Sequence, residues 1–368
     1  MAGLACAAAA ACVGCSGPDP EPVIGFAFLP SAEDQIVVAE EEIAAWGVAG
    51  GPVPRIAPDP QPDGDSAEQE VRRAMRLLAV EGLVGVVGHA GSRGSLVTAP
   101  LYNEAEVVQL VPTGTHSSLA EAGPWTFRLA PDDDAIARRM AGFAAGALGA
   151  RSVTVCHVAD EYGTGLAEAL LRECARRGLP VLDTFAYTLQ SDAATLVAGS
   201  LRRGVPDVVL LVGRDLGAGR FMRAFGEAAP GRRFVGGDGI EFRPAFAEAA
   251  GAGADSLYAV TFWHSSRPDS VSQAFVARYE RLLGRTPGPV QAMRHDALVV
   301  LARAARETRG EPEAMRAWLQ ELGVARPAHR GVTGPISFAP DRHLPLQVVR
   351  RRGGTLALVA EPEGADGR

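Results

Sequence analysis

The sequence predicts an α/β protein with two consecutive open, parallel, doubly wound sheets whose faces are covered by helices. Short apolar runs typical of buried strands alternate with amphipathic segments of helical length along most of the 368 residues. This alternation favours parallel pairing, because parallel strands need a long crossover connection that a helix usually provides. The chain is also too long for one ordinary hydrophobic core, so we expect two domains.

The first series of elements runs from residue 23 to residue 157. Its strands are short apolar runs, and its helices repeat apolar residues every three or four positions. The expected strands are Val23–Leu29, Pro54–Pro58, Leu83–Gly88, Val107–Pro112 and Ser152–His157. The expected helices are Glu33–Trp46, Ser66–Val80, Ser95–Ala105 and Ala135–Leu148.

A second, similar series follows and ends in short strands. The expected helices are Gly163–Arg177, Ala193–Arg203, Leu216–Ala228, Val271–Leu283, Val290–Glu307 and Glu313–Leu322. The expected strands are Val181–Tyr187, Asp207–Gly213, Arg233–Gly236, Ser256–Phe262, Pro335–Phe338, Leu346–Arg351 and Leu356–Val359. The pattern predicts two sheets, but it does not assign each helix to a sheet.

Composition excludes several classes of function. The net charge of −7 gives no basic field for a nucleic acid. All 36 basic residues are arginines, which excludes the lysine chemistry of Schiff bases and P-loops. The seven histidines show no metal-ligand spacing with acids or cysteines, and no base is identifiable for Ser92. We therefore expect no metal, no cofactor and no catalytic residue.

The first 21 residues are expected to form a leader and a tether. An alanine-rich apolar stretch ends in Cys12-Val-Gly-Cys15, which is typical of a secretion signal and too short for a membrane span. It resembles a bacterial lipoprotein signal with Cys15 as the lipidated residue. No positive charge precedes the stretch, however, and Cys12 stands where leucine is usual. A disordered leader with incidental cysteines is the alternative.

Two cysteines, Cys156 and Cys174, lie in the expected folded body. Cys156 is in an expected strand and Cys174 is in the helix that follows it. A disulfide between them would suit an exported protein, whereas two buried free thiols are at least as compatible with the sequence.

Two polar loops follow neighbouring strands of the first series. The segment Val84–Ser95 ends an apolar run in Gly-His and then presents Ser92 where a helix should begin. The second loop, Thr113-Gly-Thr115, follows the strand Val107–Pro112. Ligands of parallel sheets bind at such strand ends, where backbone N–H groups and the helix dipole attract an anion. These loops predict a site for a small carboxylate.

The chain resembles the leucine/isoleucine/valine-binding branch of the type I periplasmic binding proteins, which serve ABC transporters. The resemblance extends from Val23 to about Val359, and it rests on the order and spacing of motifs that are individually weak. The matching pieces are Val23-Ile-Gly-Phe-Ala, Gly85-Val-Val-Gly-His89 with Ser92, Leu110-Val-Pro-Thr-Gly-Thr115, Phe127-Arg128, His157-Val-Ala-Asp-Glu-Tyr162-Gly-Thr-Gly, Asp207-Val-Val-Leu-Leu-Val-Gly213, Gly236-Gly-Asp238-Gly239, His295-Asp-Ala and Gly334-Pro-Ile-Ser-Phe338.

The resemblance implies two lobes joined by a three-crossing hinge, with a ligand clamped between them. Lobe 1 would comprise residues 22–131 plus 263–338, and lobe 2 would comprise residues 132–262 plus 339–368. The resemblance further implies an exported protein, periplasmic or at the cell surface and anchored by its lipid, that delivers an amino acid or similar carboxylate to an ABC permease. A ligand sensor of the same fold that signals to a partner protein, or an enzyme on an α/β scaffold, is the alternative.

Family members hold the ligand's carboxylate on loops that correspond here to Ser92, Thr113 and Thr115. Hydroxyl groups and helix N-terminal amides can satisfy a carboxylate without a cation. For Ser92 the alternative is an ordinary N-cap, a position that serine favours. The threonines have the same ambiguity, and Thr115 is the preferred one.

On lobe 2 the resemblance assigns Asp238 to the ligand's amino group and Tyr162 to closure over the ligand. The alternatives are an ordinary turn aspartate and a packing residue at the start of a helix. Arg214 stands where relatives commonly have an aromatic residue, and it would favour an acidic or extended polar ligand, as would Arg93. A solvated arginine, or a local pair between Arg214 and Asp215, is the alternative.

Overall fold

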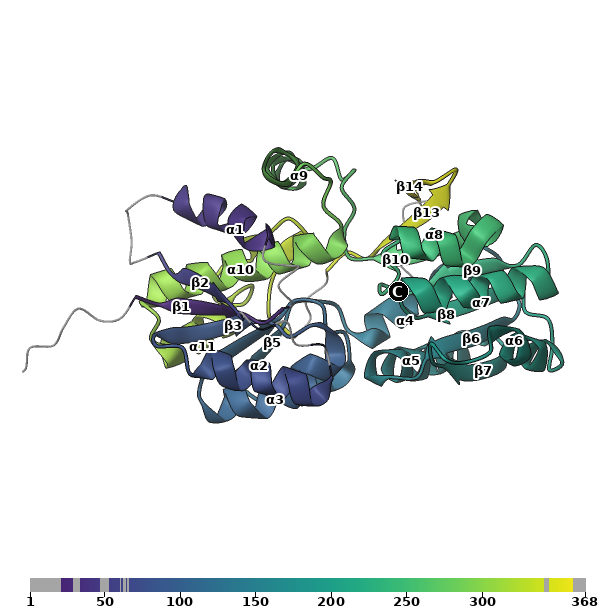
Figure 1. Ribbon diagram of the computed structural model, residues 1–368, viewed down its shortest axis with the longest axis horizontal. Coiled ribbons are helices and arrows are strands. Elements are labelled where there is room, and N and C mark those ends of the chain that lie inside the picture. The colour runs from purple at the N-terminus through teal and green to yellow at the C-terminus, as the bar shows by residue number, and fades with distance from the viewer. Residues whose placement is uncertain are drawn as a thin grey trace, which may run out of the picture.

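The computed structural model describes residues 21–28, 34–46, 53–59, 61, 64, 66–340 and 344–359. Within these residues the chain forms a five-stranded sheet, a seven-stranded sheet and a two-stranded ribbon. Figure 1 shows the two large sheets side by side along the long axis, each with helices on both faces. The prediction of two sheets in an α/β fold is confirmed. Cys15 and all but the last residue of the expected leader lie outside the described residues.

The first sheet is entirely parallel, with the strand order β2-β1-β3-β4-β5. Its strands are β1 (Val23–Phe26), β2 (Arg55–Pro58), β3 (Leu83–Val87), β4 (Val108–Val111) and β5 (Thr126–Arg128). β1 and β4 are buried along their whole length. Such strands on a sheet with both faces covered form the near-continuous apolar runs seen in the sequence.

Helices from two distant parts of the chain cover this sheet. They are α1 (Asp34–Ala44), α2 (Ala67–Leu78), α3 (Gly91–Glu104), α9 (Ser270–Leu283), α10 (Pro289–Thr308) and α11 (Pro312–Glu321). Figure 1 shows α2 and α3 on one face and α10 on the other. α10 begins with Pro289 and packs closely on the sheet, where a Cβ at Gly85 would lie 3.1 Å from the side chain of Leu301. We call this body the first lobe; it includes the ribbon of β11 (His329–Arg330) and β12 (Pro335–Ile336).

The second sheet has the order β14-β13-β10-β9-β8-β6-β7. Its parallel strands are β6 (Val153–Val158), β7 (Val181–Tyr187), β8 (Val208–Val212), β9 (Arg233–Gly236) and β10 (Leu257–Thr261). The C-terminal strands β13 (Gln347–Arg352) and β14 (Thr355–Leu358) join its edge as an antiparallel hairpin on β10. The fully parallel sheet that the sequence predicts is therefore extended by two antiparallel strands.

The second lobe consists of this sheet with five helices, and its core lies on both sheet faces. The helices are α4 (Asp133–Ala145), α5 (Glu161–Arg177), α6 (Ala193–Leu201), α7 (Asp215–Ala228) and α8 (Pro244–Ala250). In β8, Val208 and Leu210 pack with Ile136 of α4, whereas Val209 and Leu211 pack against the opposite core. This alternation follows from the two-residue period of a strand.

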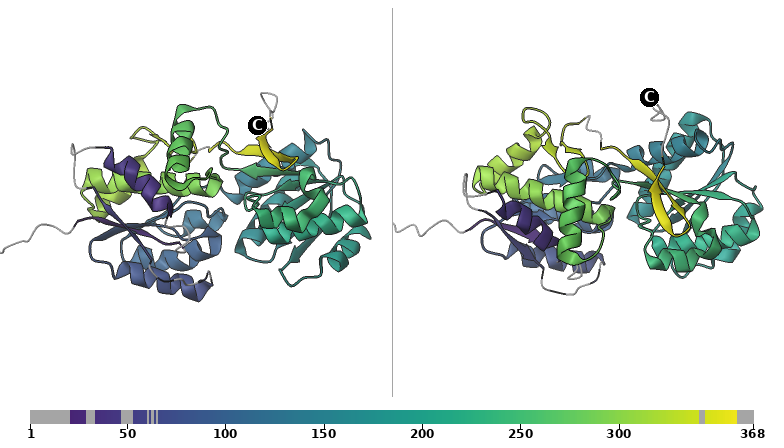
Figure 2. Two further views of the ribbon diagram at one scale, coloured as in Figure 1. Left: turned by 45° about the horizontal axis from the view of Figure 1, so that its top comes forward. Right: turned by 90° about the horizontal axis from the view of Figure 1, so that it is seen from above.

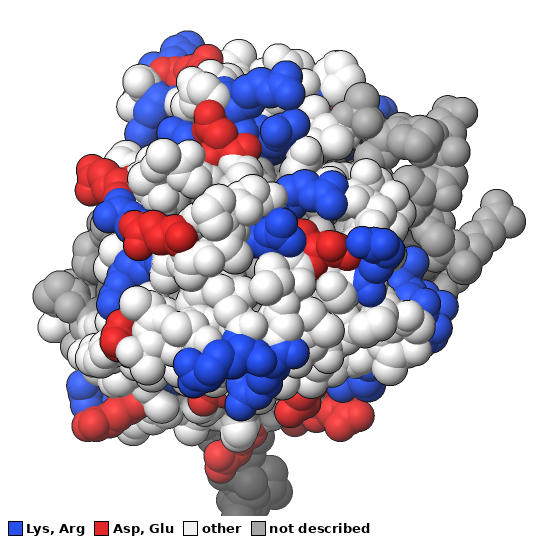
Figure 3. Space-filling model, turned by 90° about the vertical axis from the view of Figure 1, so that its right-hand side faces the viewer, with Lys and Arg blue, Asp and Glu red and all other residues white. Residues whose placement is uncertain are grey.

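The chain passes between the lobes three times: from β5 to α4, from β10 to α9 and from β12 to β13. Figure 2 shows these connections lying together between the lobes. The expected lobe boundaries, after residues 131, 262 and 338, fall within the three connections, and they stay a prediction. None of the described helices is long and apolar enough to cross a membrane. On the end of the molecule that Figure 3 presents, arginine and acidic side chains are interspersed among uncharged ones.

The structure corrects several expectations about single elements. β5 and α8 are too short to be recognised in the sequence, and the ribbon strand β11 has only two residues. Helix α3 begins at Gly91, four residues before the expected start at Ser95. Gly94 permits close packing inside its first turn, because a Cβ there would lie 3.1 Å from the side chains of Glu70 and His89. The glycines that suggested a loop therefore belong to the helix.

Candidate functional site

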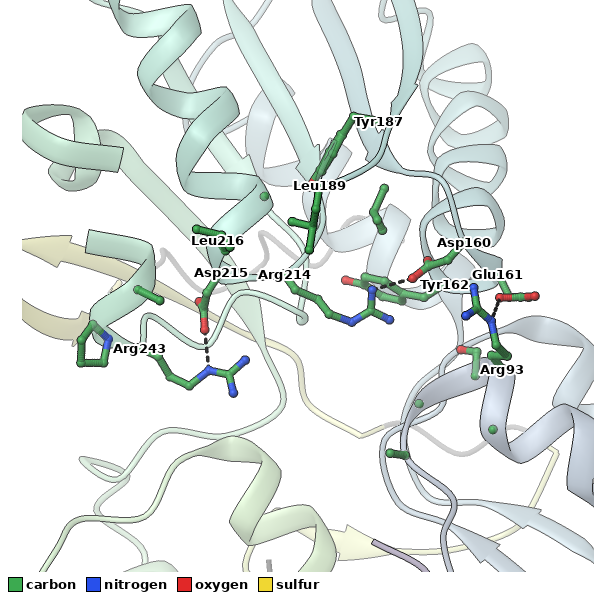
Figure 4. Close-up of a pocket in the computed structure, with 18 residues that line it drawn as sticks. Arg93, Asp160, Glu161, Tyr162, Tyr187, Leu189, Arg214, Asp215, Leu216 and Arg243 are labelled. Carbon is green, nitrogen blue, oxygen red and sulfur yellow. Dashed lines mark hydrogen bonds and ion pairs between the residues drawn. The ribbon is translucent and has the colours of Figure 1, made fainter. Parts of the chain in front are cut away.

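Two adjoining cavities, of about 590 Å³ and about 200 Å³, lie where the two lobes face each other. Both are lined by Gly91 and Ser92 of the first lobe and by Tyr162, Arg214 and Arg243 of the second. These residues follow the carboxyl ends of parallel strands, which is where ligands of open α/β sheets bind. Figure 4 shows the larger cavity with its charged side chains. We call the two cavities together the cleft.

The N-terminus of α3 forms the first-lobe wall of the cleft. Its N-cap, Ala90, has no side chain that could accept a hydrogen bond from the first free amides. Ser92 is the second helical residue and is buried, and its Oγ accepts a hydrogen bond of 3.3 Å from the backbone N–H of His116. The N-cap alternative for Ser92 is therefore wrong. Thr113 lines the smaller cavity beside it.

The other threonine of this loop, Thr115, is fully buried and is not among the residues that line the cleft. The backbone N–H of Asp133, the first residue of α4, donates a 3.0 Å hydrogen bond to the carbonyl oxygen of Thr115. The Thr115 hydroxyl and the Asp133 carboxyl group are buried, and neither has a hydrogen-bond partner among the described residues. Burial is the main cause that raises the pKa of Asp133 to about 7, and the negative charge of Asp238 adds to it. Asp133 could not be recognised in the sequence, because its neighbours Asp132 and Asp134 suggest only an acidic helix start.

A buried network of charged side chains lies behind the first-lobe wall. Glu70 and Arg73 of α2 pair at 2.6 Å, and Arg73 also contacts Asp59 at 3.1 Å. Glu70 reaches Nδ1 of His89 at 2.6 Å, and Nε2 of His89 lies 2.9 Å from the hydroxyl of Tyr102. Because burial lowers the pKa of His89, the neutral ring donates to Glu70 and accepts from Tyr102. The network thus fixes the turn between β3 and α3, and His89 is structural.

Asp238 and Tyr162 meet on the second-lobe wall. The hydroxyl of Tyr162 donates a 3.1 Å hydrogen bond to Oδ1 of Asp238 and accepts one of 3.0 Å from the N–H of Gly239. Asp238 is half-buried, follows β9 and lines the smaller cavity. Desolvation is the main cause that raises the pKa of Asp238 to about 6, against the lowering effect of Tyr162. A carboxylate and a phenol are thus held together at the cleft.

Arg214 faces the cleft, but it is occupied by partners on its own lobe. Its Nη1 lies 2.5 Å from Oδ2 of Asp160, and its guanidinium lies over the ring of Tyr162, 5.4 Å from the centroid. The expected alternative of a local Arg214–Asp215 pair is wrong, because Asp215 pairs with Arg243 at 2.7 Å. Figure 4 shows both pairs along the upper side of the cavity.

Among the described residues, an ion pair between α3 and α5 connects the two lobes across the cleft. Nε of Arg93, on α3, lies 2.6 Å from Oε2 of Glu161, on α5. Both side chains are nearly half exposed, at 43% and 45%. Arg93, which the sequence suggested as a ligand contact, therefore also contacts the opposite lobe (Figure 4).

Five side chains of the smaller cavity were not found by reasoning from the sequence: Glu241, Arg243, Phe262, Val290 and Arg294. Burial is the main cause that raises the pKa of Glu241. Arg294 lies in α10, where an arginine near a helix start suggests only a solvated side chain. No sequence signal placed the start of α10 at the cleft, because only tertiary packing brings it there.

Other candidate groups have structural partners. Cys156 and Cys174 are free and buried, which decides between the two alternatives that the sequence left open. The imidazole of His116 accepts from the N–H of Ser118, so the contact of Ser92 is with the backbone of His116 and not with its ring. Among the described residues, no group of three or more histidines, cysteines or acids could hold a metal ion.

Comparison with known proteins places this geometry among solute-binding proteins. A family model described as periplasmic binding protein matches residues 25–350. An "Amino acid binding protein" of Pseudomonas aeruginosa is 27% identical over 203 residues, which are 55% of this chain and 54% of that protein, so the match spans about half of that relative. A "Leu/Ile/Val-binding protein homolog 1" of Brucella abortus is 25% identical over 324 residues, 87% of this chain and 83% of that protein. The crystal structure of a leucine binding protein from Thermotoga maritima superimposes with a TM-score of 0.81 at 20% identity, covering 92% of this chain and 98% of that one, which shows the shared fold.

Proposed function

Because the chain belongs to the periplasmic binding protein family, we propose that it is an exported solute-binding protein that delivers an amino acid or a related small carboxylate to an ABC importer. The observation that carries this proposal is the pairing of two unlike walls across one cleft. An uncapped helix N-terminus with hydroxyl groups lies on one side, and a carboxylate held by a tyrosine lies on the other. These are the complements of the two charged groups of an α-amino acid.

The ligand's carboxylate binds on the first-lobe wall. The free amides at the start of α3 and the hydroxyls of Ser92 and Thr113 are all donors, and the helix dipole favours an anion at this end. Thr115 acts indirectly, because its side chain is packed against Asp133. The buried network of Glu70, Arg73 and His89 holds this wall in place before the ligand arrives.

The ligand's ammonium group binds Asp238 on the second-lobe wall, and Tyr162 positions that carboxylate. A cation next to Asp238 compensates the desolvation that raises its pKa, so binding and ionisation of Asp238 support each other. Arg214 forms an ion pair with Asp160, so Asp238 rather than Asp160 is the carboxylate that accepts hydrogen bonds from the ammonium group.

Closure follows from the fact that the two charged groups of one ligand are held by different lobes. A ligand that contacts residues 22–131 and 263–338 on one side and residues 132–262 and 339–368 on the other stabilises the closed state through contacts that the open state lacks. The permease would recognise this closed form. Neither step changes a covalent bond, and accordingly we assign no catalytic residue, no metal and no cofactor.

The first test is isothermal titration of the purified protein with the standard amino acids. Each ligand that binds is then compared with its amine analogue, which lacks the carboxylate, and its acid analogue, which lacks the amino group. Both analogues should bind at least about tenfold more weakly, because each leaves one charged or hydrogen-bonded group of the protein unpaired. Ser92→Ala should weaken binding of the amino acid and of the acid analogue equally.

An amine analogue that binds as well as the parent amino acid would contradict the carboxylate assignment. Unchanged ligand after prolonged incubation is expected, and turnover would instead favour an enzyme. Equal binding of the acid analogue would leave a carboxylate-binding protein but would remove Asp238 from the site.

We also propose that Cys15 carries a lipid after cleavage behind Gly14. The alanine-rich stretch before Gly14 supports this proposal. Mass spectrometry of the protein from the membrane fraction should show a diacylglyceryl-modified N-terminal Cys15, and Cys15→Ser should release the protein from that fraction. An intact Met1 or an unmodified Cys15 in the membrane-bound protein would contradict it.

A further inference from the structure

Arg294 lies at the inner side of the smaller cavity, on the first lobe. Its guanidinium lies over the ring of the buried Phe28, with the central carbon 4.0 Å from the ring centroid. Nη1 makes a long contact of 3.5 Å with Oε1 of Gln35, and Nε is buried with no hydrogen-bond partner among the described residues. This close contact with the ring of Phe28 restricts the movement of the guanidinium and stabilises its charge.

The other arginines of this cavity differ from Arg294 in having a carboxylate partner. Arg214 pairs with Asp160, and Arg243 pairs with Asp215 and lies 3.5 Å from Glu241. Arg294 forms no ion pair with any carboxylate in the described part of the chain. Burial lowers its pKa to about 10, so the side chain is still a cation at neutral pH. Partial burial of a cation that has no ion-pair partner among the described residues is costly, and an anion that enters the cavity would reduce this cost.

The described carboxylates near Arg294 do not pair with it, so its guanidinium is available to such an anion. Electrostatic interactions with Glu241, Tyr279 and Asp34 raise the pKa of Arg294, and the positive charge of Arg243 lowers it. Asp34 is engaged with Arg285, and Glu241 is shared with Arg243. A carboxylate can accept two parallel hydrogen bonds from one guanidinium, which is the arrangement that arginine favours over lysine.

We propose that Arg294 binds an anionic group at the end of the ligand's side chain, so that the protein selects amino acids with an acidic side chain. The inference rests on the proposed function, because Ser92, Thr113 and Asp238 must hold the α-carboxylate and the ammonium group. From the sequence we expected Arg214, on the second lobe, to favour an acidic ligand. This inference assigns that role to Arg294, on the first lobe. An aliphatic side chain in this position would leave the Arg294 cation unpaired next to apolar carbon atoms.

The test is the ratio of two affinities on the wild-type protein, measured by isothermal titration at pH 7.5. Glutamate is compared with glutamine, and aspartate with asparagine, since each pair differs in one charge at nearly constant size. The acidic member of at least one pair should bind about 10- to 100-fold more tightly. Leucine should bind more weakly than that acidic amino acid.

Three variants assign the preference to Arg294. Arg294→Gln should remove the ratio by weakening the acidic ligand and leaving its amide nearly unchanged. Arg294→Lys keeps the charge but loses the planar fork, and it should retain a reduced ratio. Arg303→Gln is the matched control on the same helix, because Arg303 is exposed and pairs with Glu307; it should change neither affinity.

The possible failures are distinguishable. If the wild type binds leucine or an amide as tightly as the acidic amino acids, this inference is wrong while the proposed function stands. If the wild type prefers the acidic amino acid and Arg294→Gln retains that preference, another residue binds the anionic group and the inference is again wrong. If the wild type binds no amino acid, the proposed function fails and this inference with it. The wild-type ratio does not depend on whether the variants fold.

Discussion

The two walls of the cleft use charge in opposite ways. On the first-lobe wall around α3, charged side chains lie behind the surface, where Arg73 and Glu70 are each 1% exposed. Apart from Arg93, which pairs with Glu161 across the cleft, the residues at the start of α3 that line the cleft are uncharged. On the second-lobe wall the charges themselves face the cavity, and Arg214 and Arg243 are more than half exposed.

This difference indicates two tasks. A buried network is costly to disturb, because removing one member leaves an uncompensated charge, so it holds the first wall rigid. Exposed pairs are worth little individually, and they can reorganise when a ligand arrives. We therefore expect the first wall to provide a fixed geometry for the proposed carboxylate and the second wall to provide charges that rearrange when the ligand binds.

The largest effect should come from breaking the buried network. Arg73→Met removes the guanidinium between Asp59 and Glu70, and the free energy of unfolding should fall by about 3–5 kcal/mol in urea titrations. Arg72→Met, on the next position of α2, breaks only the exposed pair with Glu68 and should cost less than about 1 kcal/mol. Similar losses in the two variants would show that the network does not stabilise the first wall.

On the opposite wall, the neutral variant Asp238→Asn should lower affinity without lowering stability, because the raised pKa of Asp238 means that its ionised form opposes folding at neutral pH. Loss of the charge that faces the ammonium group should weaken binding of the best amino acid about 10- to 100-fold in isothermal titration. Asp255→Asn is the control, since Asp255 pairs with Arg351 in the C-terminal hairpin region, away from the cleft. A change below twofold in Asp238→Asn would favour the turn-residue interpretation.

The pH dependence of binding should sharpen the same contrast. Asp238 must be ionised to hold an ammonium group, and its pKa is raised to about 6. Affinity should therefore be lost as the pH falls through 6, and binding at pH 5 should be about tenfold weaker than at pH 7.5. Asp133, whose pKa is raised to about 7, lies close by, so the experiment is repeated in Asp238→Asn. In that variant the affinity should depend less on pH between pH 7 and pH 5. An unchanged pH dependence would assign the effect to another group.

The smallest effect should come from the ion pair that joins the lobes. Arg93→Gln removes an exposed contact with Glu161, which is worth less than about 1 kcal/mol, so ligand affinity should change less than about fivefold. Raising the salt concentration should weaken binding of the wild type by a similar factor and have less effect on the variant. A loss of more than tenfold would make Arg93 a ligand contact, as the sequence first suggested.

The alternation of strands and helices, and the position of the polar loops at the strand ends, could be predicted from the sequence. These are local properties: the period of apolar residues identifies each element, and a loop after a parallel strand lies at the sheet edge where ligands bind. Ser92 and Thr113 were found in this way, whereas Tyr162 and Asp238 came from the resemblance, which also supplied the expected roles of all four. Their function as ligand contacts stays a prediction.

Which polar side chains face the cleft, and which partners they contact, depends on the three-dimensional packing of the chain. Arg214 pairs with Asp160, which is 54 positions away, and Arg93 pairs with Glu161 at a separation of 68. Thr115 turned out to be buried against Asp133, and Arg294 reaches the cleft from a helix that follows the second crossing. Partners so distant along the chain leave no local pattern, because a charged side chain has the same local sequence whether water or a carboxylate surrounds it.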